Sequence, residues 1–114
     1  GSRKDLPIEY WLPCHKKNPD GYLDVYGRMK WEDVSPTITG GCHNPSKGRF
    51  IHPDFDRAIT LREAALLQTF PEDYQFSLKS GKESVALMIG NALPPQFIKI
   101  HAQAYISHLE RASK

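Results

Sequence analysis

The 114-residue sequence predicts an α+β fold, in which short antiparallel strands in the N-terminal half precede about three helices. The first half alternates in part between apolar and polar residues and is interrupted by proline and glycine, whereas apolar residues after residue 60 recur at helical spacing. A hydrophobic content of 39% allows a modest core. The chain is therefore one domain at most, or part of a larger one.

Three segments are expected to be strands: residues 22–31, which are rich in aromatic side chains, residues 34–39 and residues 49–51. Pro36 places the second segment at a sheet edge or at a strand start, because proline cannot donate a hydrogen bond to a neighbouring strand. Residues 40–48 have the composition of a loop.

From Thr60 the pattern becomes helical. Thr60 and Glu63 have the T-x-x-E spacing of a capping box, in which each side chain accepts a backbone N–H at the start of a helix. Pro71 is expected to end this helix. Ser80 and Glu83 repeat the spacing as S-x-x-E and predict the start of a second helix.

The second helix is expected to end at Gly90–Asn91, because glycine favours the end of a helix. A third helix is expected from Pro94–Pro95, since proline costs little in the first turn. The apolar positions of this third helix recur at intervals near 3.6 residues and are Ile98, Ala102, Tyr105, Ile106 and Leu109.

Composition excludes some classes of protein and leaves others open. A net charge of +2 is compatible with nucleic-acid binding but does not argue for it. No apolar run reaches membrane-spanning length, and two cysteines make no disulfide framework, so we expect a soluble protein in a reducing, cytoplasmic setting. Gly1–Ser2 has the character of an expression scar.

Three stretches go beyond composition. They are RAITLREAALLQTFPEDYQF at residues 57–76, IGNALPP at residues 89–95, and GRMKWEDVSPTITGG at residues 27–41, which GRFIHP follows at residues 48–53. They resemble, respectively, motif IX, motif X and the end of the target-recognition region of the DNA (cytosine-5) methyltransferases. Any one of them would be a weak signal, whereas all three in the order of the family are specific.

The resemblance covers roughly residues 26–109 and finds no counterpart for residues 3–25. It implies part of the small, target-recognition domain, together with the C-terminal helix that returns to the catalytic domain. Four segments follow from it: residues 1–25, the scar and a linker or ragged edge of the recognition region; 26–56, the end of the target-recognition region; 57–79, motif IX; and 80–114, motif X and the C-terminal helix.

The Thr-Ile-Thr-Gly-Gly turn offers hydroxyls and backbone amides that suit phosphate oxygens or base edges. The matching threonine of the family lies at the DNA interface, so the resemblance makes Thr37 the leading contact. The glycines would allow close approach of the backbone to DNA, and nearby cations would neutralise phosphates. The DNA-binding candidates are Arg28, Thr37, Thr39, Gly40, Gly41, Lys47 and Arg49. The alternative is a β-hairpin with solvated charges.

Motif IX is expected to be architectural. In the family it organises the recognition domain, and Arg57, Thr60, Arg62 and Glu63 are its structural candidates here. The two arginines and the glutamate are expected to form a buried charged network. The alternative for Arg62 is a DNA contact.

Motif X resembles the turn beside the S-adenosylmethionine pocket of the family. The resemblance makes Gly90, Asn91 and Ala92 the cofactor-binding candidates, with Asn91 near the methionine part of the cofactor. An amide side chain and a helix N-terminus both suit a carboxylate. The alternative is that Asn91 merely caps the helix that precedes it.

Methylation at cytosine C5 needs a thiolate, an acid and a bound methyl donor. The family supplies them from Phe-x-Gly-x-Gly, Pro-Cys-Gln, Glu-Asn-Val and Gln-x-Arg-x-Arg motifs, and none occurs in these residues. Pro13–Cys14 is followed by His15 where the family has glutamine, so Cys14 is expected to be incidental. We therefore expect no catalytic residue in the chain.

The prediction is the C-terminal part of a methyltransferase of bacterial or phage origin, associated with restriction-modification. Its expected partners are duplex DNA and the catalytic domain of the same enzyme, with S-adenosylmethionine bound only in the complete protein. An uncovered third helix would drive self-association. The alternative is a stand-alone, non-catalytic DNA-binding or interaction module of the same family. Zinc is disfavoured, because Cys14–His15 and Cys42–His43 have none of the usual ligand spacings.

Overall fold

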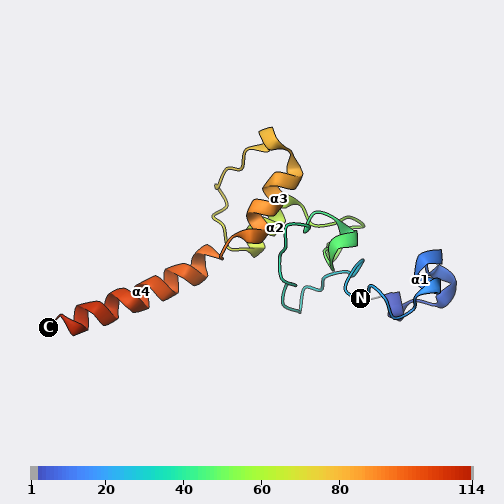
Figure 1. Ribbon diagram of the computed structural model, residues 1–114, viewed down its shortest axis with the longest axis horizontal. Helices are drawn as coiled ribbons and strands as arrows, with labels where there is room; N and C mark the ends of the chain where they lie inside the picture. The colour runs from blue at the N-terminus through green and yellow to red at the C-terminus, as the bar shows by residue number, and fades with distance from the viewer. Residues whose placement is uncertain (1–2, 114) are drawn as a thin grey trace.

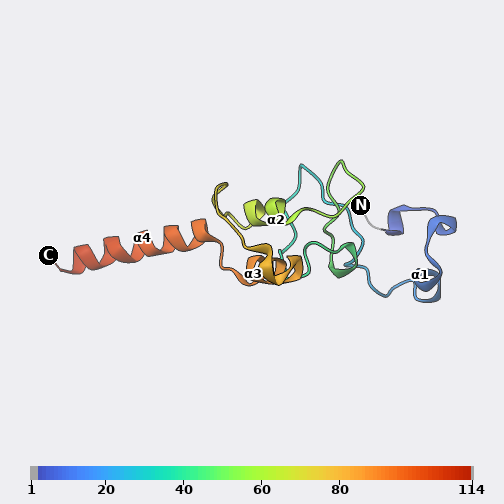
Figure 2. The ribbon, with the colours of Figure 1, turned by 90° about the horizontal axis from the view of Figure 1, so that it is seen from above.

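The computed structural model describes residues 3–113, so Gly1 and Ser2, the expected scar, lie outside the described residues. The molecule is elongated, with a radius of gyration of 18.6 Å and extents of 69 × 33 × 23 Å. A compact chain of this length would have a radius of gyration of about 13 Å. Figures 1 and 2 show helix α4 (Pro95–Ala112) projecting from the centre at one end, with helix α1 (Pro13–Lys17) at the other.

The expectation of three helices in the second half is confirmed. They are α2 (Leu61–Leu67), α3 (Lys82–Asn91) and α4. The one-turn helix α1 was not expected, and it begins at a proline in the first helical position. Four short 3₁₀ helices complete the described elements: η1 (Arg3–Asp5), η2 (Ile8–Tyr10), η3 (Pro45–Lys47) and η4 (Leu78–Ser80).

The predicted α+β class, with its antiparallel strands, is wrong. The described residues contain no strand, and their β-type pairing is limited to two isolated bridges. One bridge is parallel, between Arg28 and Ile51, and the other is antiparallel, between Ile51 and Ala58. The N-terminal half is therefore a set of turns and extended segments rather than a sheet.

The reason lies in the backbone of the aromatic segment. Tyr22 and Tyr26 both have a φ of 57°, in the left-handed region, which interrupts an extended strand. Gly27 and Met29 each make one backbone hydrogen bond with Ile51, of 3.1 and 2.9 Å, and the pairing goes no further. The segment has the aromatic residues that favour strands, but it lacks the continuous pairing with a neighbouring segment that defines a sheet.

The predicted helix boundaries met different outcomes. The Thr60–Glu63 capping box is confirmed, because both of its reciprocal hydrogen bonds are present. The corresponding box at Ser80 is wrong: Ser80 belongs to η4, and α3 begins after Gly81, whose φ is 85°. Helix α2 ends at Leu67, before it reaches Pro71. Thr69 lies between these two residues and has a φ of 65°, which a helix does not allow.

The core lies where α2 and α3 pack against each other and against the extended segments. Small residues on the two helices allow their close approach, and aromatic and aliphatic side chains from the N-terminal half cover them. The buried apolar residues are Ile38, Cys42, Phe50, Ile59, Ala64, Ala65, Val85, Ala86 and Ile89. Helix α4 contributes no buried residue. No helix among the described residues is long and apolar enough to cross a membrane.

Candidate functional site

The turn at residues 37–41 is held by its own hydrogen bonds. The backbone N–H of Cys42 donates to the carbonyl of Thr39 at 3.0 Å, and the N–H of Gly41 donates to the Thr39 hydroxyl at 3.3 Å. Thr37 is exposed, and its hydroxyl hydrogen bonds no other described residue. The sequence predicted that both threonine hydroxyls contact DNA. The Thr37 hydroxyl has no hydrogen bond within the described residues, whereas the Thr39 hydroxyl also stabilises the turn.

This turn packs directly on the end of helix α3. A Cβ placed on Gly90 would lie 2.2 Å from the backbone nitrogen of Gly40 and 2.2 Å from the carbonyl carbon of Thr39. A Cβ on Gly40 would in turn meet the side chain of Leu87 at 2.8 Å. The glycines therefore allow two backbones to meet within the chain. Gly90 and Asn91 are the last two residues of α3, and Ala92 follows them. The DNA candidate turn, residues 37–41, and this helix end, residues 90–92, which we call the cofactor candidate turn, form one packed unit.

Gln68 joins the end of α2 to the end of α3. Its side-chain nitrogen donates to the carbonyl of Ile89 at 3.0 Å and to the carbonyl of Ala92 at 3.2 Å. The Ile89 carbonyl also accepts the backbone N–H of Ala92 at 3.2 Å, so Gln68 is its second donor, and it supplies a donor to the Ala92 carbonyl beyond the helix end. The Asn91 side chain makes no hydrogen bond within the described residues and is exposed. The side chain that caps this helix is thus Gln68 rather than Asn91.

Thr69 holds the start of α4 in the same way. Its hydroxyl oxygen accepts a hydrogen bond from the backbone N–H of Gln96 at 3.1 Å. Gln68 and Thr69 are consecutive residues directly after α2, and together they contact both sides of the Gly90–Pro95 link. The link between α3 and α4 is therefore positioned by side chains that follow the end of α2.

A cavity of about 390 Å³ lies between the recognition segment and motif X. Residues of segments 35–38 and 90–94 and of the end of α2 line it. It is lined by Ser35, Pro36, Thr37, Ile38, Leu67, Gln68, Gly90, Ala92 and Pro94. The structure thus brings the leading DNA candidate, Thr37, and two of the three cofactor candidates to one cavity.

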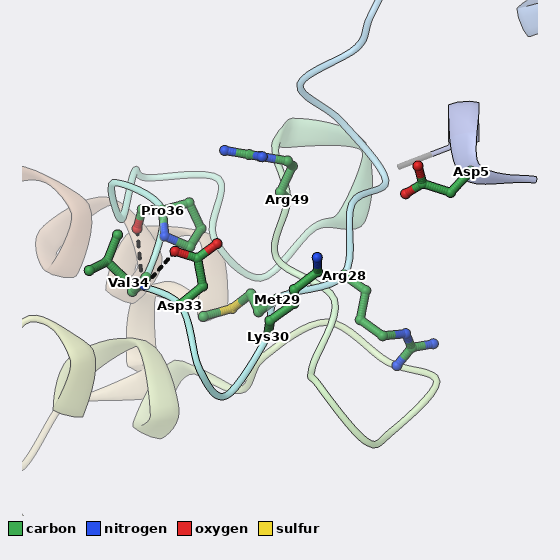
Figure 3. Close-up of a pocket in the computed structure, with 9 residues that line it drawn as sticks. Asp5, Arg28, Met29, Lys30, Asp33, Val34, Pro36 and Arg49 are labelled. Carbon is green, nitrogen blue, oxygen red and sulfur yellow. Dashed lines mark hydrogen bonds between the residues drawn. The ribbon is translucent and has the colours of Figure 1, made fainter. Parts of the chain in front are cut away.

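A second cavity, of about 310 Å³, is lined by side chains of both charges (Figure 3). Lys30 and Arg49 are exposed on it, and the carboxylates of Asp5 and Asp33 also line it. Figure 3 shows the side chains of Arg28 and Arg49 extending in different directions. Arg49 and Lys30 are thus accessible to a phosphate, and Lys30 was not among the predicted contacts.

Arg28 is engaged elsewhere. Its guanidinium donates to the carbonyl of His52 at 2.6 Å, to the carbonyl of Phe55 at 2.9 Å and to the carboxylate of Asp56 at 2.5 Å. These bonds hold the loop at residues 52–57 against the recognition segment. Arg28 therefore stabilises the fold by binding this loop, whereas Lys47 and Arg49 are exposed to solvent.

The charged residues of motif IX form a smaller group than expected. Arg57 makes two parallel hydrogen bonds to Glu63, of 2.8 and 2.9 Å, and Glu63 also accepts the N–H of Thr60 at 2.6 Å. The hydrogen bonds from Arg57, followed by those from Thr60, lower the pKa of Glu63 to about 2. The group is partly exposed, and Arg62 is exposed and lies over the ring of Phe76 instead.

The two cysteines have different environments. Cys14 is exposed on α1, and Cys42 is fully buried in the core, where burial raises the pKa of its thiol. No group of three or more potential ligands among the described residues is arranged to hold a metal ion.

Gln68 and Thr69 were missed in the sequence. Both were read as part of a helix that ran on to Phe70, and their partners lie 21 to 27 residues away. The only local signal was polar side chains directly before the Phe70–Pro71 helix stop.

Comparison with known proteins identifies the family of the chain. The family model for C-5 cytosine-specific DNA methylase matches residues 3–107. The chain belongs to this family. The match begins at residue 3, so it includes residues 3–25, for which the sequence motifs gave no usable resemblance.

The chain is also similar to several curated proteins. It is 47% identical over 113 residues to "Type II methylase M.HgiDII" of Herpetosiphon aurantiacus, covering 96% of this chain and 32% of that protein. It is 40% identical over 90 residues to "Type II methyltransferase M1.BsuMI" of Bacillus subtilis (strain 168), covering 79% and 21%. It is 41% identical over 96 residues to "DNA (cytosine-5)-methyltransferase 1B" of Oryza sativa subsp. japonica, covering 83% and 6%.

The chain thus spans about a third or less of the length of these relatives. No solved structure matches it.

Proposed function

We propose that this chain is the C-terminal part of a DNA (cytosine-5) methyltransferase, and that it contributes DNA contacts and one edge of the S-adenosylmethionine pocket. The observation that carries the proposal is the backbone contact of Gly90 with Thr39 and Gly40. A turn with an exposed hydroxyl and a turn with an exposed amide are packed together in a chain of this family. Within such an enzyme, that contact would join substrate recognition to cofactor binding.

The DNA side of the proposal rests on residues 37–41 and the cations beside them. The exposed Thr37 hydroxyl can donate to or accept from a phosphate or a base edge. Exposed cations close to this turn, Lys47 and Arg49, would neutralise phosphates and release counterions. Lys30, on the same cavity wall as Arg49, is added to the candidates. Arg28 is a poorer candidate, because its donors are already bonded to the 52–57 loop.

The cofactor side rests on residues 90–92. Asn91 presents an amide donor and acceptor that no described residue uses, and this fits the carboxylate and ammonium of an amino-acid group. Gly90 and Ala92 would form the adjoining wall. S-adenosylmethionine supplies an activated methyl group when bound. The thiolate nucleophile and the acid would come from the rest of the enzyme, because their motifs do not occur in these residues.

The catalytic domain is proposed as the surface on which α4 lies. Helix α4 carries an apolar stripe with no buried residue, and its exposed apolar residues include Ile98, Tyr105, Ile106 and Leu109. A helix that is apolar on one face normally buries that face. The relatives are at least three times as long as the aligned region, which leaves room for such a domain.

The test joins this chain to the remainder of its own gene product and measures methyl transfer to duplex DNA. We expect activity in the joined protein. Thr37→Ala and Asn91→Ala should each lower it at least about tenfold, since each removes a proposed contact. Asn18→Ala, an exposed asparagine on a distant loop, is the matched control and should leave activity unchanged.

Kinetics separate the two roles. Asn91→Ala should raise KM for S-adenosylmethionine, whereas Thr37→Ala should weaken DNA binding. The proposal is wrong if the remainder of the gene product methylates DNA equally well without this chain. That result would favour an accessory, non-catalytic module.

A further inference from the structure

Building on the proposed function, we propose that Gln68 is a positioning residue for S-adenosylmethionine. It holds the Gly90–Ala92 turn in its binding geometry without touching the cofactor. A residue of motif IX would thereby set the affinity of a site that motif X forms.

The hydrogen bonds of Gln68 bracket the turn. Its two carbonyl partners, of Ile89 and Ala92, lie on either side of Gly90 and Asn91. Both partners are acceptors only, so the side-chain nitrogen of Gln68 must face them, and both of its N–H groups are used. The backbone on each side of Asn91 is thus fixed by one side chain.

Gln68 is itself held in place. Its backbone N–H donates to the carbonyl of Ala64 at 3.0 Å, at the end of α2. Ala64 is fully buried in the core. The amide that brackets the turn is therefore attached to the end of a helix that is anchored in the core through Ala64 and Ala65. Movement of the turn relative to α2 would break both bonds.

The direction of the Asn91 amide depends on this arrangement. Asn91 is exposed and has no bond of its own to a described residue, so only its backbone determines where its side chain points. No residue other than Gln68 donates a side-chain hydrogen bond to the Ile89 or Ala92 carbonyl within the described residues. Loss of the Gln68 donors would leave the Ala92 N–H bond to the Ile89 carbonyl in place but would release the Ala92 carbonyl, which follows Asn91, and so loosen the placement of the amide.

The variants for the test are Gln68→Glu and Gln68→Met in the complete enzyme. The first keeps the shape but places carboxylate oxygens against two carbonyls, and the second keeps the volume without donors. Gln75→Glu is the matched control, since Gln75 bonds only to the backbone two residues away on an exposed loop. Circular dichroism establishes that each variant is folded at the temperature of the assay.

The measurements are equilibrium dissociation constants of S-adenosylmethionine, by calorimetry, and of a duplex oligonucleotide, by fluorescence anisotropy. We expect the constant for S-adenosylmethionine to rise about tenfold or more in both variants, and that for DNA to stay within about twofold. This selective loss separates positioning from a general loss of structure. The Gln68→Met variant keeps the test informative if the charge of the other variant prevents folding.

Two outcomes would overturn the inference, and they are distinguishable. If the wild-type complete enzyme binds no S-adenosylmethionine, the proposed function fails and this inference fails with it. If the wild type binds and folded Gln68→Met binds equally well, only the positioning role is wrong. An equal loss of cofactor and DNA affinity would also contradict it, because it would indicate a structural role alone.

Discussion

Gly90 in helix α3 lies against the backbone of Gly40, and a Cβ on Gly90 would be 2.2 Å from the Gly40 nitrogen. Real side chains do not approach backbone atoms so closely, so the two segments meet only because Gly90 has no side chain. The contact is between two backbones, which cannot rotate away as a flexible side chain can. It fixes the spacing between the DNA candidate turn and the cofactor candidate turn.

The first prediction concerns this contact. Alanine is favoured over glycine inside a helix by about 1 kcal/mol. We nevertheless expect Gly90→Ala to reduce the free energy of unfolding by about 2 kcal/mol, because overpacking against backbone outweighs the gain in helix propensity. Urea denaturation measures the difference, with Ser84→Ala in the same helix as control. A variant as stable as the wild type would show that the 37–41 turn moves away freely.

The second prediction concerns pH. The pKa of Glu63 is lowered to about 2 in the folded state from an ordinary value of 4.5. A lowered pKa contributes stability above the unfolded value that is lost as the pH falls toward the folded value. Glu63 should therefore stabilise the fold above about pH 5 and lose this contribution between about pH 4.5 and 2. Glutamine at this position can still close the capping box, so Glu63→Gln removes the negative charge that faces Arg57 at 2.8 Å and His52 at 3.7 Å.

We expect Glu63→Gln to be less stable than the wild type at neutral pH by about 1–2 kcal/mol, a figure reduced for solvent screening. The difference should shrink as the pH falls through this window. Urea denaturation at several pH values measures it, and Glu110→Gln on exposed α4 is the control. A constant difference from pH 7 to 2 would be inconsistent with a lowered pKa for Glu63.

The capping boxes show how far local signals reach. Thr60 and Glu63 were predicted correctly, because their spacing acts within one turn of helix. Ser80 and Glu83 have the same spacing, yet Gly81 between them takes a left-handed φ and Ser80 ends in a 3₁₀ turn. A local pattern is necessary for the motif, and the backbone of the intervening residues decides whether it forms.

The absence of strands and the role of Gln68 could not be predicted, because both depend on contacts between residues that are distant in the sequence. Sheet formation depends on continuous pairing between distant segments, and here it stops after a single residue, Ile51. Gln68 acts on a carbonyl 21 residues away, which no spacing rule connects. Thr37 was singled out by the family resemblance rather than by a spacing rule, and its side chain is exposed.

The third prediction contrasts two arginines beside the recognition turn. Arg49→Gln should weaken binding of the complete enzyme to duplex DNA and reduce the salt dependence of the affinity by about one phosphate contact, with stability unchanged. Arg28→Gln should instead lower the free energy of unfolding, since it removes the guanidinium donors to the His52 and Phe55 carbonyls and the ion pair with Asp56. Salt titrations and urea denaturation separate the two. Equal loss of DNA affinity in both variants, with no loss of stability, would contradict the assignment.

The fourth prediction uses the two cysteines as probes of the fold. Cys14 is exposed and should react with iodoacetamide in the native chain at the rate of a free thiol. Cys42 is fully buried with a raised thiol pKa and should react at least about 100-fold more slowly, because the core must open first. Mass spectrometry of peptides at timed intervals measures both rates in one sample. In urea the two rates should converge, and equal rates without urea would show that the core is open.

The last prediction concerns helix α4. Its apolar residues are exposed in this chain; Ile106, for example, is 55% exposed. We expect the isolated chain to self-associate through this face as its concentration rises, since an amphipathic helix gains by burying its apolar side. Ile106→Glu should abolish the association while changing the free energy of unfolding of the monomer by less than about 0.5 kcal/mol. Sedimentation velocity measures the first effect and urea denaturation the second, with Gln103→Glu as a charge-matched control on the same helix.

Joining the remainder of the enzyme should also suppress the association, because the proposed catalytic domain would cover the same face. Association that persists in the joined protein would place the α4 surface elsewhere and contradict the docking of this helix on that domain.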